Sequence, residues 1–187
     1  MTVLRFDWQR ICIRDAIYKD VSAKILNVGS NVDSANLRGT FPSHVRNSDF
    51  VMHDDTLDED LPVDYIFDAT EPWPDFEDRF DLVILGDILE HMEPEKAVLT
   101  LIEAGKAGDR LCITVPNDDR LGPGWRSDGT RAPEEEWNTT PGSYHVQQVT
   151  EDKLRSWLEE TKWYIEDFRT VPYVFCDEGY FVLAKRA

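Results

Sequence analysis

Glycine and acidic residues stand at the ends of several short apolar runs in this chain. Glycine lets a main chain approach a ligand closely because it has no Cβ atom, and a carboxylate accepts hydrogen bonds from hydroxyl and amino groups. Where strands lie parallel in an open sheet, ligands bind beyond the carboxyl ends of the strands. We therefore expect a ligand site at one edge of a sheet, built from the residues that end these runs: Gly29, Asp54, Asp68, Gly86-Asp87 and Pro116-Asn117.

One histidine is a candidate for proton transfer on its position alone. His145 stands near the end of a polar segment, residues 117–148, and shortly before a predicted helix that begins at Thr150, so its ring can face a substrate. An imidazole with its ordinary pKa of about 6.5 can take a proton from a hydroxyl or an amine. A histidine that bonds to main-chain groups where the helix begins is equally consistent with this position. His44 and His53 offer no argument beyond a surface loop and a strand end.

Acidic runs raise the question of a metal site. A hard cation needs several oxygen ligands that converge from separate parts of the chain, and a consecutive run cannot converge in this way. We interpret three runs as solvated faces: Asp54-Asp55, Asp58-Glu59-Asp60 and Glu134-Glu135-Glu136. Asp118-Asp119 together with His145 is a better candidate, although a metal there is the weaker interpretation. We therefore expect no metal site.

Periodic apolar residues predict the elements that would position these groups. Helical spacing predicts helices over Asp7 to Asp20, over Pro94 to Lys106 and from Thr150 onward, where a threonine followed by acids is typical of an N-cap. The apolar face of the first helix is predicted to hold Trp8, Ile11, Cys12, Ala16 and Ile17. Short apolar runs predict strands over residues 24–29, 49–54, 63–68, 81–86, 110–115 (ended by Pro116), 164–171 and 180–185.

Alternating strands and helices, with buried apolar strands early and two strands late, predict an α/β protein with a three-layer α/β/α sandwich. The last two strands are expected to pair antiparallel. No repeat and no Gly/Ser-rich or Pro-rich tract divides the sequence, so we expect a single domain over residues 1–187. Within it we expect an N-terminal helical segment, residues 1–22, and an irregular loop on the substrate side, residues 117–148.

The acidic surplus limits the partners. The chain has 187 residues, with 20 Lys and Arg against 37 Asp and Glu, and a formal charge of -17. Nucleic-acid affinity rests on many Lys and Arg contacts with phosphates, so we expect no duplex nucleic acid as a partner. No apolar stretch approaches the length of a membrane span, which is about 20 residues. The N-terminus lacks the pattern of a signal peptide. Three cysteines far apart in the sequence indicate free thiols in a reducing compartment. We expect a soluble, cytoplasmic protein that contacts no membrane.

Several segments in a fixed order carry a resemblance to a known family. They are Ile25 to Ser30, Phe67-Asp68-Ala69, Phe80 to Met92, Ala107 to Asn117, His145 with Thr150 and Leu154, and Tyr180 to Lys185. The stretch around Asp81–Met92 is the most specific of them. In this order the sequence resembles class I S-adenosylmethionine-dependent methyltransferases. The resemblance implies a Rossmann-like, mostly parallel seven-stranded sheet with a C-terminal antiparallel strand.

The resemblance also implies a cofactor, S-adenosyl-L-methionine, and the residues that hold its sugar and methionine. Gly29, Ser30 and Asn31 would form the turn beside the cofactor after the first strand. Asp54 or Asp55, after the second strand, would accept hydrogen bonds from both ribose hydroxyls. The family usually has two or three glycines in this first turn, whereas this chain has Gly29 alone, and Asn27 replaces an acid that is common in the family.

The remaining contacts implied by the resemblance come from the third and fourth strands. Asp68 would accept a hydrogen bond from the adenine amino group, and Ala69 would leave room beside the ring. Asp87 would lie near the methionine end of the cofactor, and Ile88 near the adenine. His91 would lie at the mouth of the site, with a histidine that caps the next helix as the structural alternative.

These observations favour a methyltransferase that acts on a small-molecule acceptor by O- or N-methylation, with His145 as general base and His91 as the second catalytic candidate. The reaction is an in-line displacement in which the protein mainly holds the acceptor and the methyl group in contact. The alternative is a catalytically inactive methyltransferase-like domain that serves as a binding or regulatory subunit, which the single-glycine turn favours. A nicotinamide dehydrogenase would need a G-x-G-x-x-G turn, which the sequence lacks. The acceptor and the oligomeric state stay open, a homodimer included.

Overall fold

The computed structural model describes residues 5–29, 35–49, 63–117, 145–172 and 178–186. Its helices are α1 (Arg5–Lys19), α2 (Ala35–Thr40), α3 (Pro94–Ala107) and α4 (Glu151–Glu160), and a 3-10 turn, η2, spans Leu89–His91. Its strands are β1 (Ile25–Val28), β2 (Val45–Asp49), β3 (Tyr65–Ile66), β4 (Leu82–Gly86), β5 (Arg110–Asn117), β6 (Trp163–Val171) and β7 (Glu178–Arg186). The predicted α/β class is confirmed.

The strands form one mixed sheet in the order β3-β2-β1-β4-β5-β7-β6. The five strands from β3 to β5 in this order pair in parallel, whereas β7 runs antiparallel to both β5 and β6. β1 and β4 pair with Val28 opposite Leu85, which aligns the carboxyl ends of these two strands. The sheet is therefore mostly parallel with antiparallel C-terminal strands, as the sequence predicted.

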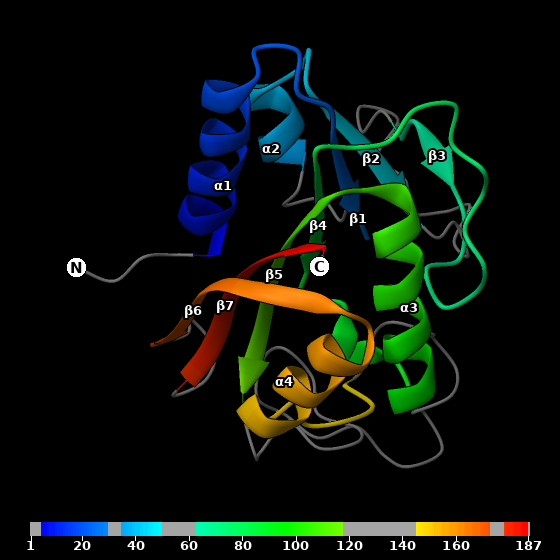
Figure 1. The fold of residues 1–187 in the computed structure, drawn as a ribbon, viewed down its shortest axis with the longest axis vertical. Coiled ribbons are helices and arrows are strands. Elements are labelled where there is room, and N and C mark those ends of the chain that lie inside the picture. Colours follow the sequence, from blue (N-terminus) through cyan, green and yellow to red (C-terminus); the bar gives the residue numbers. More distant parts are fainter. Residues whose placement is uncertain (1–4, 30–34, 50–62, 118–144, 173–177, 187) are drawn as a thin grey trace.

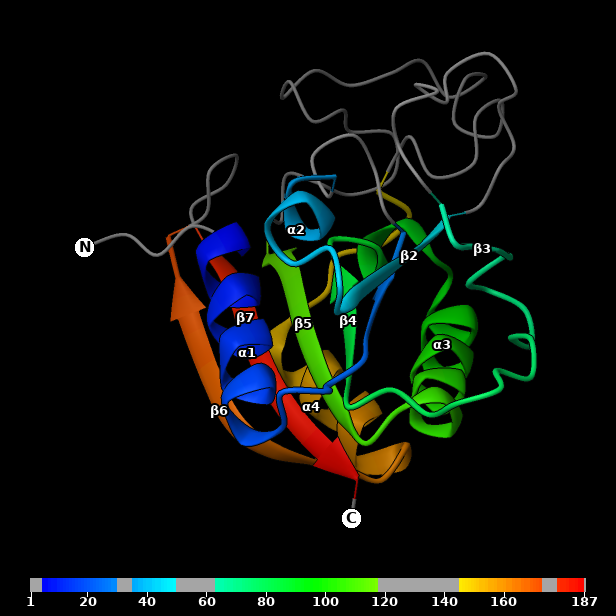
Figure 2. The same ribbon diagram turned by 90° about the horizontal axis from the view of Figure 1, so that it is seen from above.

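Helices cover both faces of the sheet. α1 and α2 lie over one face, where Trp8 and Leu37 belong to a core shared with β1, β4 and β5. α3 and α4 lie over the other face, where Leu101 and Leu158 pack with Val83. Figures 1 and 2 show these helices on opposite sides of the strands. The central strand β1 is buried along its whole length because both of its faces are covered.

Local sequence explains how the helices begin and which face they bury. α3 has Pro94 in its first turn, where the missing N–H has no partner to lose. α4 follows Thr150, whose side-chain oxygen accepts a hydrogen bond from the N–H of Lys153 at 3.3 Å, so the predicted N-cap is confirmed. In α1, Ile11 is 47% exposed and Ile13 is buried instead. The prediction for Ile11 was wrong because it lies at the margin of the face that Trp8, Cys12 and Ala16 bury against the sheet.

Two strands differ from the sequence prediction. A strand was predicted over residues 49–54, but β2 occupies Val45–Asp49, and residues 50–62 lie outside the described residues. β2 is mostly polar, so it shows no apolar pattern, although its main chain pairs with β1 and β3. Pro116 was predicted to end the strand before it, but β5 continues to Asn117. β4 ends opposite Thr114, so this part of β5 pairs with β7 alone, and a proline is tolerated there.

Two cysteines lie side by side in the core. Cys12 and Cys112 are buried free thiols. Burial, together with the neighbouring Cys12 thiol, raises the pKa of Cys112 well above its ordinary value, so its thiol stays neutral in the core. These two cysteines are core residues, and Cys176 lies outside the described residues. Within the described ranges no helix has the length and apolar character needed to cross a membrane.

Candidate functional site

The carboxyl ends of β1 and β4 meet at a tight turn. Gly29 follows β1 with a φ of 69°, a left-handed conformation that glycine adopts without a steric penalty. An ideal Cβ atom on Gly29 would lie only 2.5 Å from Cγ2 of Ile88. The turn therefore has no room for a side chain. Gly29 and Ile88 were both predicted for the site, and the structure brings them into contact.

Asp87, which follows β4, also has a left-handed main chain, with a φ of 55°. Its N–H donates a hydrogen bond to the carbonyl of Thr114 in β5 at 2.8 Å. A non-glycine residue in this conformation stores roughly 1–2 kcal/mol of strain, and such residues gather at active sites and ligand clamps. The strained main chain at Asp87 agrees with the predicted place of the site.

α1 reaches the same edge of the sheet through Gln9, which is 3% exposed. Its side-chain Nε2 donates to Oγ1 of Thr114 at 3.2 Å, and it lies 2.6 Å from where a Cβ atom on Gly86 would be. Its Oε1 is buried and has no hydrogen-bond partner among the described residues. A buried oxygen without a hydrogen-bond partner lowers the stability of the fold by about 1–3 kcal/mol. A ligand N–H or O–H that donates to Oε1 of Gln9 would recover this energy. Sequence reasoning missed Gln9 because a glutamine inside an amphipathic helix carries no motif.

Asp68 and Ala69 lie half-buried just after β3. Oδ1 of Asp68 accepts hydrogen bonds from the N–H and the hydroxyl of Thr70 at 2.8 and 2.7 Å, which closes a local turn. The carbonyl of Ala69 accepts from Nε1 of Trp73 at 3.0 Å and from the hydroxyl of Thr100 at 2.8 Å. One oxygen of the Asp68 carboxylate is thus used by the turn, and the segment is tied to α3 rather than free.

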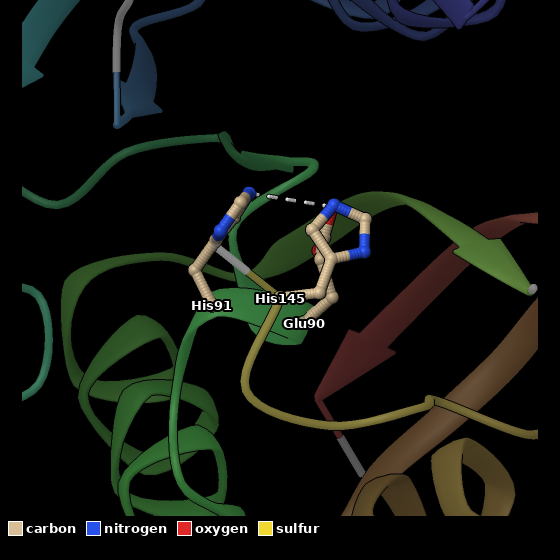
Figure 3. Close-up of side chains that lie close together, drawn as sticks. All are labelled: Glu90, His91 and His145. Atoms are coloured by element: carbon tan, nitrogen blue, oxygen red, sulfur yellow. Dashed lines mark ion pairs between the residues drawn. The ribbon is translucent and has the colours of Figure 1, made fainter. Parts of the chain in front are cut away.

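Glu90, His91 and His145 form a cluster of side chains (Figure 3). Glu90 and His91 belong to η2, which follows β4, and His145 comes from the segment that precedes α4. Nε2 of His91 lies 3.9 Å from Oε1 of Glu90, and the two imidazole rings meet edge to face with centroids 4.8 Å apart. Glu90 is buried, and both histidines are half-buried. The structure therefore brings the two predicted catalytic histidines together and adds Glu90, which the sequence analysis had not singled out.

Hydrogen bonds between two distant segments fix this cluster. The N–H groups of Val146 and Gln147 donate to the carbonyl of Glu90 at 2.7 and 3.3 Å. The buried side-chain Nε2 of Gln147 donates to two more carbonyls, those of Leu89 at 3.2 Å and Met92 at 2.6 Å. Gln147 and Met92 are 55 residues apart in the sequence. The position of His145 beside η2 is therefore a property of the tertiary structure.

Polar side chains also meet at the carboxyl end of β5. Nδ2 of Asn117 donates to the hydroxyl oxygen of Tyr180 at 2.5 Å, and Nε2 of Gln148 donates to Oδ1 of Asn117 at 3.2 Å. Burial raises the pKa of Tyr180, so its phenol is neutral at neutral pH. Asn117 was predicted for this edge, and the network bonds the segment before α4 to β5 and β7.

Several predicted site residues cannot be placed: Ser30, Asn31, Asp54, Asp55 and most of the segment 117–148 lie outside the described residues. Their roles remain predictions. The last residue of β2 is Asp49, and its main chain pairs with Ile66 of β3. Sequence reasoning overlooked Asp49 because it placed the end of the second strand later in the chain.

No family model matches the sequence, and no curated protein sequence matches it. Solved structures do share the fold. An S-adenosylmethionine-dependent methyltransferase from Clostridium acetobutylicum has a TM-score of 0.66 and 11% identity, over 96% of this chain and 91% of that chain. The Burkholderia thailandensis 1,6-didemethyltoxoflavin-N1-methyltransferase, with 1,6-didemethyltoxoflavin and S-adenosylhomocysteine bound, has a TM-score of 0.62 and 18% identity, over 96% of this chain and 78% of that chain. The magnesium protoporphyrin IX methyltransferase of Synechocystis, with S-adenosylhomocysteine bound, has a TM-score of 0.60 and 15% identity, over 98% of this chain and 83% of that chain.

The chain has the class I S-adenosylmethionine-dependent methyltransferase fold. This confirms the fold that the motifs predicted. At such low identities the likeness establishes the fold alone, because one fold can host many activities. In a methyltransferase fold, as in other open α/β sheets, ligands lie beyond the carboxyl ends of the parallel strands. Gly29, Asp87 and η2 all follow such strand ends.

Proposed function

We propose that the protein transfers a methyl group from S-adenosylmethionine to an oxygen or nitrogen atom of a small-molecule acceptor. The observation that carries this proposal is the Glu90–His91–His145 cluster, which follows β4 of a methyltransferase fold. Its imidazoles offer proton acceptors near the strand ends where such a fold binds ligands. We also propose that residues 1–187 form one domain, a three-layer α/β/α sandwich on a Rossmann-like seven-stranded sheet.

The described residues at this edge fit the cofactor. Gly29 turns the chain without a Cβ atom, Ile88 adds an apolar side chain beside it, and Asp68 brings a half-buried carboxylate. We assign Gly29, Ser30, Asn31 and Asp87 to the methionine end, and Asp68, Ala69 and Ile88 to the adenine. Asp54 or Asp55 is assigned to the ribose, with Asp49 as a further candidate because it ends β2. When bound, the cofactor supplies a methyl group on a positively charged sulfur.

The chain's own residues hold the acceptor and take its proton. As the acceptor's O–H or N–H bond breaks, the proton passes to an imidazole nitrogen of His145. The acceptor atom then bonds to the methyl carbon as the carbon–sulfur bond breaks. Glu90 positions both rings, since its carboxylate lies near His91 and its carbonyl holds the segment of His145. The segment 117–148, which contains His145, is assigned to the substrate side.

Calorimetric titration of the full chain with S-adenosylmethionine and S-adenosylhomocysteine tests the proposal. Asp68→Ala is expected to weaken binding by about 1–3 kcal/mol, or roughly 10–100-fold, as expected for the loss of a hydrogen bond to a charged group. Alanine also opens the turn at Thr70, so Asp68→Asn is the matched variant: it keeps an acceptor oxygen for the turn and removes the charge. Asp75→Ala, at an exposed position, is the control and should bind like the wild type.

Each outcome of this titration has a defined meaning. Equal affinity of Asp68→Ala, Asp68→Asn and the wild type would remove Asp68 from the cofactor site. A wild type that binds neither molecule would overturn the proposed methyl transfer. It would then favour the inactive, methyltransferase-like binding or regulatory subunit, for which the observation is the turn with Gly29 as its single glycine.

A further inference from the structure

We propose that Glu90, His91 and His145 bind one divalent transition-metal ion, and that the acceptor's oxygen completes its coordination. One ligand atom from each residue lies within 4.8 Å of the other two. Three atoms with this spacing share a point that lies at most about 2.8 Å from each of them, whereas ligand distances in zinc sites are about 2.0–2.2 Å. Small rotations of the two half-buried rings would close this difference. Figure 3 shows the three side chains converging from two segments.

The donor set indicates the kind of metal. Two imidazoles and one carboxylate are the protein ligands of catalytic zinc sites and of non-haem iron(II) sites, which keep positions open for water or substrate. Mg²⁺ and Ca²⁺ prefer sites built from oxygen ligands, so this cluster should discriminate against them. The sequence does not indicate this set of ligands, because Glu90 and His91 are neighbours in η2 whereas His145 joins them only through the fold.

The surrounding main chain makes the cluster a built site rather than a chance approach of surface groups. The carbonyl of Glu90 accepts hydrogen bonds from Val146 and Gln147, the two residues that follow His145. The Glu90 side chain is 2% exposed and that of His91 is 23% exposed, so neither ligand has to be drawn in from solvent. A buried carboxylate is also a strong ligand, because it loses little hydration when the cation arrives.

The metal gives the proposed reaction a route for the acceptor's proton. A divalent ion would lower the pKa of a bound hydroxyl, so the acceptor's O–H bond would break with release of the proton to water. The oxygen anion would then bond to the methyl carbon as the carbon–sulfur bond breaks. In this state His145 is a ligand rather than the base. The acceptor class becomes specific: a small molecule with a hydroxyl at the methylated position. This part of the inference rests on the proposed function, whereas metal binding itself does not.

Titration of the chelator-treated full chain with Co²⁺ tests the site. The chain has a formal charge of -17, so weak cation binding to its acidic surface is expected, and the readout must report nitrogen ligation. Visible absorption of Co²⁺ does so. We expect one equivalent to bind, displaced by Zn²⁺ but not by Mg²⁺. His91→Ala, His145→Ala and Glu90→Gln should each lower the affinity by at least about 10–100-fold, the range found for groups that merely support metal ligands.

Two controls separate ligand loss from misfolding. His44→Ala removes a histidine at the start of β2, at the opposite edge of the parallel strands, and should bind Co²⁺ like the wild type. Far-ultraviolet circular dichroism checks that each variant is folded. If truncation of the histidines disturbs the fold, Glu90→Gln still tests the site, because it keeps the shape of the side chain. A wild type without a Co²⁺ spectrum, or folded variants of all three ligands with unchanged affinity, would overturn the site.

The same protein distinguishes this inference from the proposed function. Binding of S-adenosylmethionine by a chain that takes up no metal would remove the metal site and leave His145 as the base. Metal uptake through the three residues, without any binding of the cofactor, would keep the site and overturn methyl transfer. Full turnover after chelation would show that the metal has no part in the proton step.

Discussion

The parallel and antiparallel halves of the sheet differ in what their residues do. In the parallel half, β1 and β4 are followed by Gly29 and Asp87, both with positive φ, and η2 holds two residues of the histidine cluster. In the antiparallel half, β7 pairs with β5 from Glu178 to Lys185 and with β6 with a single break in register, between Ile165 and Asp167. Lys162, just before β6, also has a positive φ, of 63°. The proposed site residues gather at the carboxyl ends of the parallel strands, whereas the described part of the antiparallel half contributes paired strands and the packing of Phe181 against α1. We infer that the proposed function is concentrated in the parallel half, whereas both halves contribute to stability through the buried core.

The largest expected effect is on catalysis alone, in the parallel half. His145→Ala should reduce methyl transfer by roughly 10²–10⁴-fold, the usual value of a group that assists proton transfer. Its affinity for the cofactor and its stability should stay close to those of the wild type, because the bonds that hold the segment come from Val146 and Gln147. Steady-state kinetics and calorimetry measure the two quantities. Unchanged turnover on the true acceptor would make His145 a structural residue.

The second effect is on stability alone, in the antiparallel half. Phe181 of β7 is 1% exposed and stacks on Trp8 of α1, with ring centroids 6.0 Å apart. Phe181→Ala should lower the free energy of unfolding by about 3–5 kcal/mol, through lost burial and the cavity that remains. Tyr164→Ala, at a 62% exposed position of β6, should stay within about 0.5 kcal/mol. Denaturant unfolding compares the two variants, and similar losses for both would contradict the role assigned to the buried Phe181.

A smaller effect tests the strained turn. Gly29→Ala should destabilise the protein by about 1–3 kcal/mol, because alanine is strained at positive φ and its Cβ meets Ile88. Cofactor affinity should fall as well. In the double variant with Ile88→Ala the clash is removed and the strain stays, so the loss should be less than the sum of the two single losses. Gly39→Ala, in α2 with nothing within 4 Å of its Cβ position, should be neutral or stabilising. Equal effects at Gly29 and Gly39 would remove the argument from conformation.

The smallest effect concerns pH. Hydrogen bonds from Lys19 and Arg110 lower the pKa of Asp15, although partial burial opposes them. A carboxyl with a lowered pKa stabilises the folded state above its unfolded pKa of about 3.9, and this contribution is lost as the pH falls through the folded value. Asp15→Asn should therefore cost at most about 1 kcal/mol at neutral pH, since the ion pair is partly exposed. In unfolding experiments at acidic pH the difference from the wild type should disappear, and a difference that grows in acid would have the wrong sign.

Much of the fold was predictable because its signals are local. The apolar runs of β1 and β4, the proline at the start of α3 and the Thr150 cap of α4 depend on neighbours in the sequence. β2 was missed because a mostly polar strand is defined by its hydrogen bonds to other strands rather than by its own pattern. α2 was missed as well, since it is short and held by Leu37 in a core formed from distant elements.

The sequence by itself determined most of the alternating strands and helices, the glycine and acidic residues at the strand ends, and His91 and His145 as residues able to move a proton. Only the tertiary structure decided that the two histidines share one cluster with Glu90, and that Gln9 reaches the same edge of the sheet. The physical reason is that these contacts depend on hydrogen bonds between segments far apart in the chain, such as those from Gln147 to the carbonyls beside η2. The periodicity of the sequence does not indicate such bonds, because they form only when α4 packs on the sheet that contains β4.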